Sequence, residues 1–296
     1  MPSRMLPFPL IDTHLHLWDL ERFAYEWVRE EAVLNQTHDL DAFDAGRNGE
    51  VAVAKMVFVE CTVSFDDAAA REEVRWVHQI AEHDARLQGI VAHASLERGA
   101  AIRPHLEWLA DQPLVRGVRR LLQDEPDPDF CLQPSFVEGV QRLAAFDFAF
   151  DVCVYHHQLP QVIELVDQCP DVSFVLDHIG KPAIREGHLD PWRAHIAALA
   201  DRPNVVCKVS GVLTEADPAA WTPEAVRPYL EHAIEAFGFD RVMFGGDWPV
   251  LKLASTYPEW VQLVRAVVYD ASSAEQHRLF RGTAERVYRL GAAETA

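Results

Sequence analysis

Short apolar runs alternate with longer, charge-rich segments along the whole chain. Eight such runs, built largely from Val, Ile, Leu, Phe and Ala, cover residues 10–12, 53–59, 87–92, 115–118, 148–154, 172–176, 205–209 and 241–244. Their starts are separated by roughly 25 to 45 residues, which is enough for a strand, a loop, a helix and a return. The pattern predicts eight buried parallel strands.

Most segments between the runs show the apolar spacing of amphipathic helices. Three clear examples are residues 68–81, 158–168 and 223–237. Eight alternating β and α units predict an α/β fold, a single TIM-type (β/α)₈ barrel that residues 1–296 form as one domain. We expect a closing helix at 272–290, with Ser273 as its N-cap.

Three irregular stretches follow predicted strands. The longest, residues 18–48, is rich in Trp, Phe, Tyr and Asp, and residues 123–134 and 181–191 are dense in Pro and Asp. Because the loops after the strands form the active-site face of such a barrel, we expect these stretches to wall a pocket.

The charge balance narrows the range of partners. The chain has 46 acidic and 27 basic residues and a formal charge of −19, which argues against nucleic acid and anionic lipid. Five scattered cysteines without a C-x-x-C pair predict reduced thiols and exclude a Cys-rich zinc module. With no 18-residue apolar run and no recognisable signal peptide, we expect a cytoplasmic protein with a small-molecule partner. A homodimer is compatible with the sequence.

The strongest chemical signal is D-T-H-x-H at the end of the first predicted strand. Side chains alternate along a strand, so His14 and His16 point the same way, into the mouth of the barrel. Two imidazoles on one face can hold a divalent cation such as Zn²⁺. An isolated H-x-H pair is weak evidence, but its position at a strand end favours a metal site over ordinary polar residues.

Two more strand ends carry reactive side chains. His178 follows the sixth strand, where it is either a ligand or acid/base group, or a core histidine bonded to a backbone carbonyl. Asp247 follows two glycines after the eighth strand, where a turn or helix cap is the alternative. As a carboxylate beside three histidines it can bind the ion, take a proton from water and return it to the leaving group.

These motifs resemble the amidohydrolase superfamily. D-T-H-x-H, D-H-x-G-K-P and G-G-D-W-P, together with G-V-R-R-L-L-Q-D-E-P at 117–126, look like its sugar-lactonase branch, which includes L-fuconolactonase-like and 2-pyrone-4,6-dicarboxylate-lactonase-like proteins. The resemblance covers essentially the whole chain. It implies that His14 and His16 are a metal pair, that Asp247 is the general acid/base, and that His178 binds metal or the substrate carbonyl.

The sequence departs from the superfamily pattern at two points. After the fifth strand it reads Tyr155-His156-His157, any of which could face the mouth, and the other departure is on the fourth strand. Arg119 stands where many members carry a carbamylated lysine, so the resemblance implies one divalent ion, Zn²⁺, rather than a bridged pair. Some lactonases of this branch work without metal, so the ion is an expectation that a chelator must test.

Other candidates each have two interpretations. Glu60 points into the mouth or caps a helix, and Arg119 binds substrate or forms a structural salt bridge. His156 is a further ligand or a substrate contact. Aromatic residues either wall a sugar ring or pack at the rim, and these are Trp18, Trp27 and Trp248. Lys208 is solvated or paired.

The prediction is therefore an enzyme, a hydrolase that opens a sugar-acid lactone. Asp247 deprotonates water and then protonates the ring oxygen, while the metal, or Arg119 with His178, stabilises the oxyanion. One alternative is a non-oxidative decarboxylase of an aromatic or unsaturated acid on the same barrel. Another is a non-catalytic binding protein, which four convergent polar groups argue against.

Overall fold

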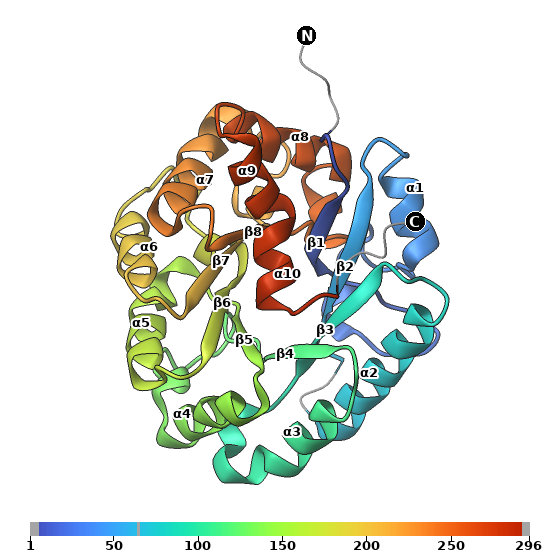
Figure 1. Cartoon of the computed structure of the whole chain (residues 1–296), viewed down its shortest axis with the longest axis vertical. Coiled ribbons are helices and arrows are strands. Elements are labelled where there is room, and N and C mark those ends of the chain that lie inside the picture. The colour runs from blue at the N-terminus through green and yellow to red at the C-terminus, as the bar shows by residue number, and fades with distance from the viewer. Residues whose placement is uncertain (1–5, 64–65, 292–296) are drawn as a thin grey trace.

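Eight parallel strands form one sheet in the order β1 to β8 in the computed structural model, which describes residues 6–63 and 66–291. The strands are β1 Leu10–Leu15, β2 Val53–Val59, β3 Leu87–His93, β4 Val115–Arg119, β5 Ala149–Val152, β6 Ser173–Leu176, β7 Val205–Val209 and β8 Val242–Phe244. They form a ring with the helices outside it (Figure 1). The predicted α/β barrel is confirmed.

Hydrogen bonds between β1 and the segment after β8 close the ring. The amide of His16 donates to the Trp248 carbonyl at 2.8 Å, and the amide of Asp247 donates to the His14 carbonyl at 2.7 Å. The Gly246 amide donates to the Asp12 carboxylate at 2.7 Å. The closing contacts therefore lie at the same strand ends that carry the candidate chemistry.

The outer helices bury one apolar face each against the sheet. They are α2 Asp67–Ala81, α3 Arg103–Ala110, α4 Pro134–Gln141, α5 Leu159–Gln168, α6 Trp192–Ala200, α7 Pro223–Phe237 and α8 Tyr257–Val267. Short 3₁₀ turns lie at Glu26–Val28, Leu96–Ile102, Phe130–Leu132, Arg142–Phe146, His156–Gln158, Asp177–Gly180, Leu213–Glu215 and Val250–Leu253. The helices predicted at 68–81, 158–168 and 223–237 are confirmed.

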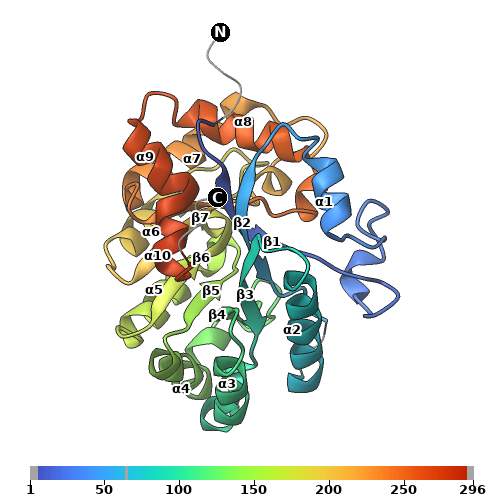
Figure 2. The ribbon, with the colours of Figure 1, turned by 45° about the vertical axis from the view of Figure 1, so that its right-hand side comes forward.

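The stretch at 18–48 is more regular than expected. It contains α1, Leu40–Gly46, which begins where the Asp39 carboxylate accepts a hydrogen bond from the Ala42 amide. Phe43 is the one residue of α1 that is fully buried. Figure 2 shows α1 and the blue loop before it at one side of the barrel. The helix supports the wall that this stretch was expected to form.

The closing helix predicted at 272–290 is confirmed at residues 273–287, but its middle turn is π-helical. The segment divides into α9 Ser273–His277, a π-helical turn at Arg278–Gly282 and α10 Thr283–Val287. The N-cap is Ser272 rather than Ser273, because the Ser272 hydroxyl accepts from the Glu275 amide while the Glu275 carboxylate accepts from the Ser272 amide. The π turn, which ends at Gly282, shifts the helical register between α9 and α10.

The segment that begins with α10 covers one end of the barrel, where it lies across the ring of strands in Figure 1. Its apolar side chains join the core inside the ring, which consists of Ile11, Val57, Val59, Val91, Ala149, Val175, Val206, Met243, Ala284, Tyr288 and Leu290. On the same side, the buried Lys55 ammonium contacts the Glu285 carboxylate and the Gly291 carbonyl. Within the described part of the chain, no helix is long and apolar enough to cross a lipid bilayer.

Candidate active site

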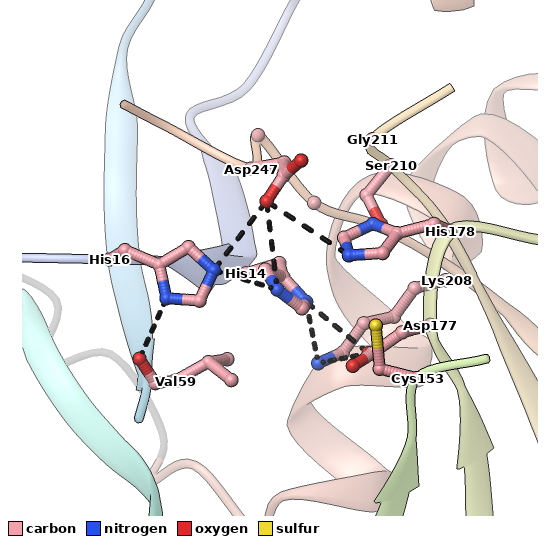
Figure 3. A network of polar contacts seen from close by, with 12 residues as sticks. His14, His16, Val59, Cys153, Asp177, His178, Lys208, Ser210, Gly211 and Asp247 are labelled. Carbon is pink, nitrogen blue, oxygen red and sulfur yellow. Dashed lines mark hydrogen bonds and ion pairs between the residues drawn. The ribbon is translucent and has the colours of Figure 1, made fainter. Parts of the chain in front are cut away.

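The four predicted strand-end residues converge on one point. Asp247 Oδ1 lies 3.5 Å from His16 Nε2, 3.7 Å from His14 Nε2 and 4.0 Å from His178 Nε2. Figure 3 shows the three imidazoles arranged around this carboxylate oxygen. All four side chains are buried, so their mutual orientation is fixed by packing.

A buried carboxylate sets the position of Asp247. Asp12 accepts hydrogen bonds from the His14 amide, the Gly246 amide and the Tyr257 hydroxyl. A Cβ on Gly246 would lie 2.4 Å from Asp12 Oδ2 and 2.5 Å from the Tyr257 ring, so this close approach requires glycine. Burial raises the pKa of Asp12 to about 6. Asp12 thus ties the Asp247 loop to the strand that carries the two histidines.

His178 and Asp247 both have left-handed backbones, each with a φ of 53°. Such a conformation costs a residue with a side chain of order 1–3 kcal/mol and persists when its surroundings enforce it. For His178 these surroundings include Ser210, whose hydroxyl lies 2.9 Å from Nδ1 of the ring. A Cβ on Gly211 would lie 2.2 Å from that nitrogen. The ring is held with Nε2 toward Asp247.

Protonation states follow from burial and neighbouring charges. Burial, with help from the Lys208 ammonium, holds the pKa of His14 well below its ordinary value, and burial does the same for the pKa of His178. Burial acts to raise the pKa of Asp247, but the imidazoles of His178 and His16 hold it below its ordinary value. Near neutral pH the imidazoles of His14 and His178 are therefore neutral, and the Asp247 carboxylate is ionised.

The donor set fits a divalent metal ion. His14 Nε2 and His16 Nε2 lie 3.2 Å apart, close to the ~3.3 Å between two nitrogens that share a tetrahedral zinc at ~2.0–2.1 Å. His16 Nδ1 lies 2.9 Å from the Val59 carbonyl, which must accept its proton, so the Nε2 lone pair faces inward. Two lone pairs this close repel unless a cation or proton lies between them, so His14, His16 and Asp247 could hold an ion.

Below the histidines lies a fully buried ionic cluster. The Lys208 ammonium lies 2.5 Å from Asp151 Oδ2, 3.1 Å from Asp177 Oδ1 and 3.2 Å from His14 Nδ1. Asp177 Oδ1 lies 3.3 Å from the same His14 nitrogen. Of the two interpretations of Lys208, pairing is confirmed. The cluster fixes the His14 ring from below.

The structural salt bridge expected of Arg119 is confirmed, and the same side chain lines the cavity above the site. Its Nε and Nη2 contact Oε1 and the backbone carbonyl of Glu60 at 2.7 and 2.6 Å, and the guanidinium also lines the cavity above the site. Glu60 itself lies fully buried behind Arg119, and the N-cap of α2 is Asp66. The helix-cap interpretation of Glu60 is therefore wrong, and its carboxylate contacts the Arg119 guanidinium of the cavity wall.

A cavity of about 520 Å³ opens above Asp247. Its walls are formed by Trp27, Cys61, Thr62, Arg119, Leu121, Gln123, Asp124, Glu125, Pro126, Cys153, Lys181, Thr214 and Val250, with His16, His178 and Asp247 at its base. Trp18 and Trp248 lie behind this wall and are buried, and the Trp18 indole donates to the Gln36 carbonyl at 2.8 Å. Rim packing is their observed position, whereas Trp27 faces the cavity.

His156 lies away from the histidine cluster. It lines a neighbouring cavity of about 330 Å³ with Tyr155 and His157, and this cavity shares Lys181 and Thr214 with the larger one. The position gives His156 no contact with Asp247 and makes it a candidate for contacts at the edge of the site only.

Sequence reasoning gave no role to Asp12, Asp151, Asp177, Ser210 or Tyr288. Alternation along β7 could have predicted part of this cluster. Val206 faces the barrel interior, and Lys208 and Ser210 follow it at intervals of two residues on the same face. Along β5 the same spacing places Asp151 after the inward Ala149. A charged residue at an inward-facing position of an otherwise apolar strand therefore indicates a buried ionic cluster.

Comparisons with known proteins extend over nearly the whole chain. The family model described as "Amidohydrolase" matches residues 11–290. L-fucono-1,5-lactonase from Burkholderia multivorans is 35% identical over 292 residues, which cover 95% of this chain and 96% of the relative.

Solved structures agree with this assignment. The crystal structure of an amidohydrolase from Burkholderia multivorans with bound zinc has a TM-score of 0.85 at 34% identity, covering 96% of this chain and 100% of that one. 2,6-dihydroxybenzoate decarboxylase from Rhizobium has a TM-score of 0.63 at 12% identity, covering 95% and 98% of the two chains. This second likeness extends to the fold alone.

Proposed function

The chain belongs to the amidohydrolase family and is an enzyme, and from that premise we propose that it hydrolyses the ring ester of a neutral sugar-acid lactone. The observation that carries the proposal is the Asp247 carboxylate. Its Oδ1 lies within 4.0 Å of three imidazole nitrogens, at the base of a cavity large enough for a sugar ring. The name of the 35% identical relative, L-fucono-1,5-lactonase, supports the same class of substrate.

Asp247 is suited to move the proton in both halves of the reaction. Its ionised form accepts a proton from the attacking water, and the resulting acid returns that proton to the ring oxygen as the ester bond breaks. Lactone opening needs one proton taken and one returned, so a single carboxylate is sufficient. When bound by His14, His16 and Asp247, a zinc ion supplies Lewis acidity at the carbonyl and acidifies water.

His178 is placed to stabilise the developing oxyanion. When the Ser210 hydroxyl donates to Nδ1, the proton of the neutral ring lies on Nε2, the nitrogen that faces the cavity base. A preorganised N–H donor at this position favours the tetrahedral intermediate over the planar ester. Arg119, at the wall of the same cavity, supplies a second group that can contact a substrate oxygen.

The cations in the cavity wall favour a neutral substrate. Arg119 is paired with the Glu60 carboxylate, and the Lys181 ammonium lies 2.5 Å from the Gln123 amide oxygen and 3.7 Å from the Glu215 carboxylate. Because both charges are already compensated, a dicarboxylate would find no unpaired cation. Hydroxyl groups, in contrast, match the side chains of Thr62, Gln123, Asp124 and Thr214.

The experiment is a panel of aldono-1,5- and aldono-1,4-lactones assayed by proton release in weak buffer, with and without a chelator. We expect saturable turnover of 1,5-lactones with the configuration of L-fuconolactone, reduced by the chelator and restored by zinc. A parallel assay measures carbon dioxide release from 2,6-dihydroxybenzoate, the substrate class of the alternative. Decarboxylation without hydrolysis of any lactone would overturn the proposal.

A further inference from the structure

A tyrosine from the opposite end of the barrel reaches the ionic cluster below the histidines. Tyr288 follows α10, in the segment that covers the barrel end, and it is fully buried. Its hydroxyl donates to Asp151 Oδ2 at 2.7 Å. The Lys208 ammonium also lies over its ring, 5.4 Å from the centroid. Tyr288 therefore touches both partners of the central ion pair.

The contacts continue without a break to the reacting centre. Asp151 Oδ2 accepts from Lys208, and Lys208 contacts His14 Nδ1 and Asp177 Oδ1. The second nitrogen of the His14 ring, Nε2, is the one nearest to His16 and Asp247. From the tyrosine hydroxyl to the imidazole, each side chain is fully buried.

The hydrogen bonding of the Asp151 carboxylate depends on Tyr288. Within residues 6–63 and 66–291, its Oδ1 has no hydrogen-bond partner. Its Oδ2 accepts from two donors, the Tyr288 hydroxyl and the Lys208 ammonium. Loss of the hydroxyl would leave a buried carboxylate with Lys208 as its remaining donor, and stronger attraction would draw the ammonium toward Asp151 and away from His14 and Asp177.

We propose that Tyr288 is a positioning residue for the active site, which acts through Asp151 and Lys208 to hold His14 Nε2 toward Asp247. The inference deepens the proposed function, since it assumes that His14 belongs to the reacting centre. It gives the segment at the barrel end a role in the chemistry in addition to covering apolar side chains.

The test compares Tyr288→Phe, which keeps the ring and loses one oxygen, with two controls. Tyr229→Phe removes the same atom from a buried tyrosine of α7 whose hydroxyl has no hydrogen-bond partner within the described residues. Leu290→Ala weakens the apolar packing of the same segment without touching the ionic cluster. For each protein we would measure zinc affinity by chelator competition, the ¹⁵N signals of the His14 ring and the thermal midpoint.

We expect Tyr288→Phe to weaken zinc binding about tenfold, the lower end of the effect of removing an outer partner of a metal ligand, and to shift the His14 signals. Leu290→Ala should lower the thermal midpoint more than Tyr288→Phe does, but leave the zinc affinity and the His14 signals unchanged. Tyr229→Phe should also leave the zinc affinity and the His14 signals unchanged. Unchanged His14 signals and zinc affinity in Tyr288→Phe, or equal changes in Leu290→Ala, would overturn the inference.

The outcome is separable from the proposed function. A wild-type protein that opens no lactone would refute the lactonase, while the His14 signals and zinc affinity would still decide the role of Tyr288. If the wild type binds no zinc, the His14 signals alone decide it, because they report the ring position without metal or substrate.

Discussion

Replacement of Asp247 by asparagine is the sharpest test of the chemistry. Asparagine keeps the volume of the side chain and tolerates the left-handed backbone at this position, where φ is 53°. The fold should therefore survive, with a thermal midpoint close to that of the wild type. The amide cannot accept a proton from water, so the first half of the reaction loses its base.

The size of the loss follows from the geometry. Removal of a general base typically costs about 10²–10⁴ in rate, which corresponds to roughly 3–5 kcal/mol of barrier. Asp247 Oδ1 faces His14, His16 and His178. In the proposed reaction the same carboxylate also protonates the leaving oxygen. Because both proton transfers fail together, we expect a decrease in kcat at or above about 10⁴.

The pH profile gives an independent readout. A general base works when it is deprotonated, so the wild-type rate should fall as pH decreases through the pKa of Asp247. Neighbouring imidazoles hold that pKa below its ordinary value of 3.8 in spite of burial, so activity should persist at pH 5 and fall below about pH 4. The residual rate of Asp247→Asn should not decrease in this pH range, because the variant has no carboxylate to protonate at this position.

The assay is initial-rate hydrolysis of the best lactone across pH, with circular dichroism to verify folding. Asp147→Asn is the matched control, because Asp147 is also an aspartate in the left-handed region, with a φ of 54°, and lies on the surface next to Arg289. It should keep the wild-type rate. A folded Asp247→Asn protein within threefold of the wild-type rate would refute the reasoning and make His178 the leading base.

Elemental analysis of the purified protein should find about one divalent ion per chain, and His16→Ala should lose it; two tightly bound ions would contradict the single site. Arg119→Ala should reduce both turnover and the free energy of unfolding, the latter by about 3–5 kcal/mol, because it leaves the Glu60 carboxylate buried without its partner. Adding Glu60→Gln should recover stability in urea unfolding but not kcat/KM, and recovery of both would make Arg119 purely structural. For Asp12, burial raises the pKa from 3.8 to about 6, so the neutral form stabilises the fold below pH 4 and this contribution is lost as pH rises through 6. Asp12→Asn should therefore gain stability relative to the wild type by up to about 3 kcal/mol between pH 4 and 7, and a constant difference in urea unfolding would refute this.

The local patterns predicted most of the fold because strands and long helices carry their own periodicity. The exceptions are short or depend on packing. In α1, Leu40–Gly46, Phe43 is the one fully buried residue, so no apolar period exists and the Asp39 cap is the main signal. The closing segment has a continuous helical pattern, and its π turn becomes explicable only when Leu279 and Phe280 are seen buried against the barrel.

The first contacts of the site were predictable, but the support beneath them was not. His14, His178 and Asp247 converge because parallel strand ends meet at one rim, a rule that follows from the order of the strands alone. The contact between Tyr288 and Asp151 joins residues 137 positions apart and depends on where a late segment docks. Spacing along the sequence carries no such information.

The seam between β1 and the segment after β8 has a consequence for inactivation. The peptide groups of His14, His16 and Asp247 make the hydrogen bonds that complete the ring, and their side chains form the reacting cluster. A molecule whose ring has opened along this line has no intact cluster, so heat inactivation and the loss of barrel structure should be one cooperative event. The same amides should exchange hydrogen with solvent only as slowly as the barrel opens.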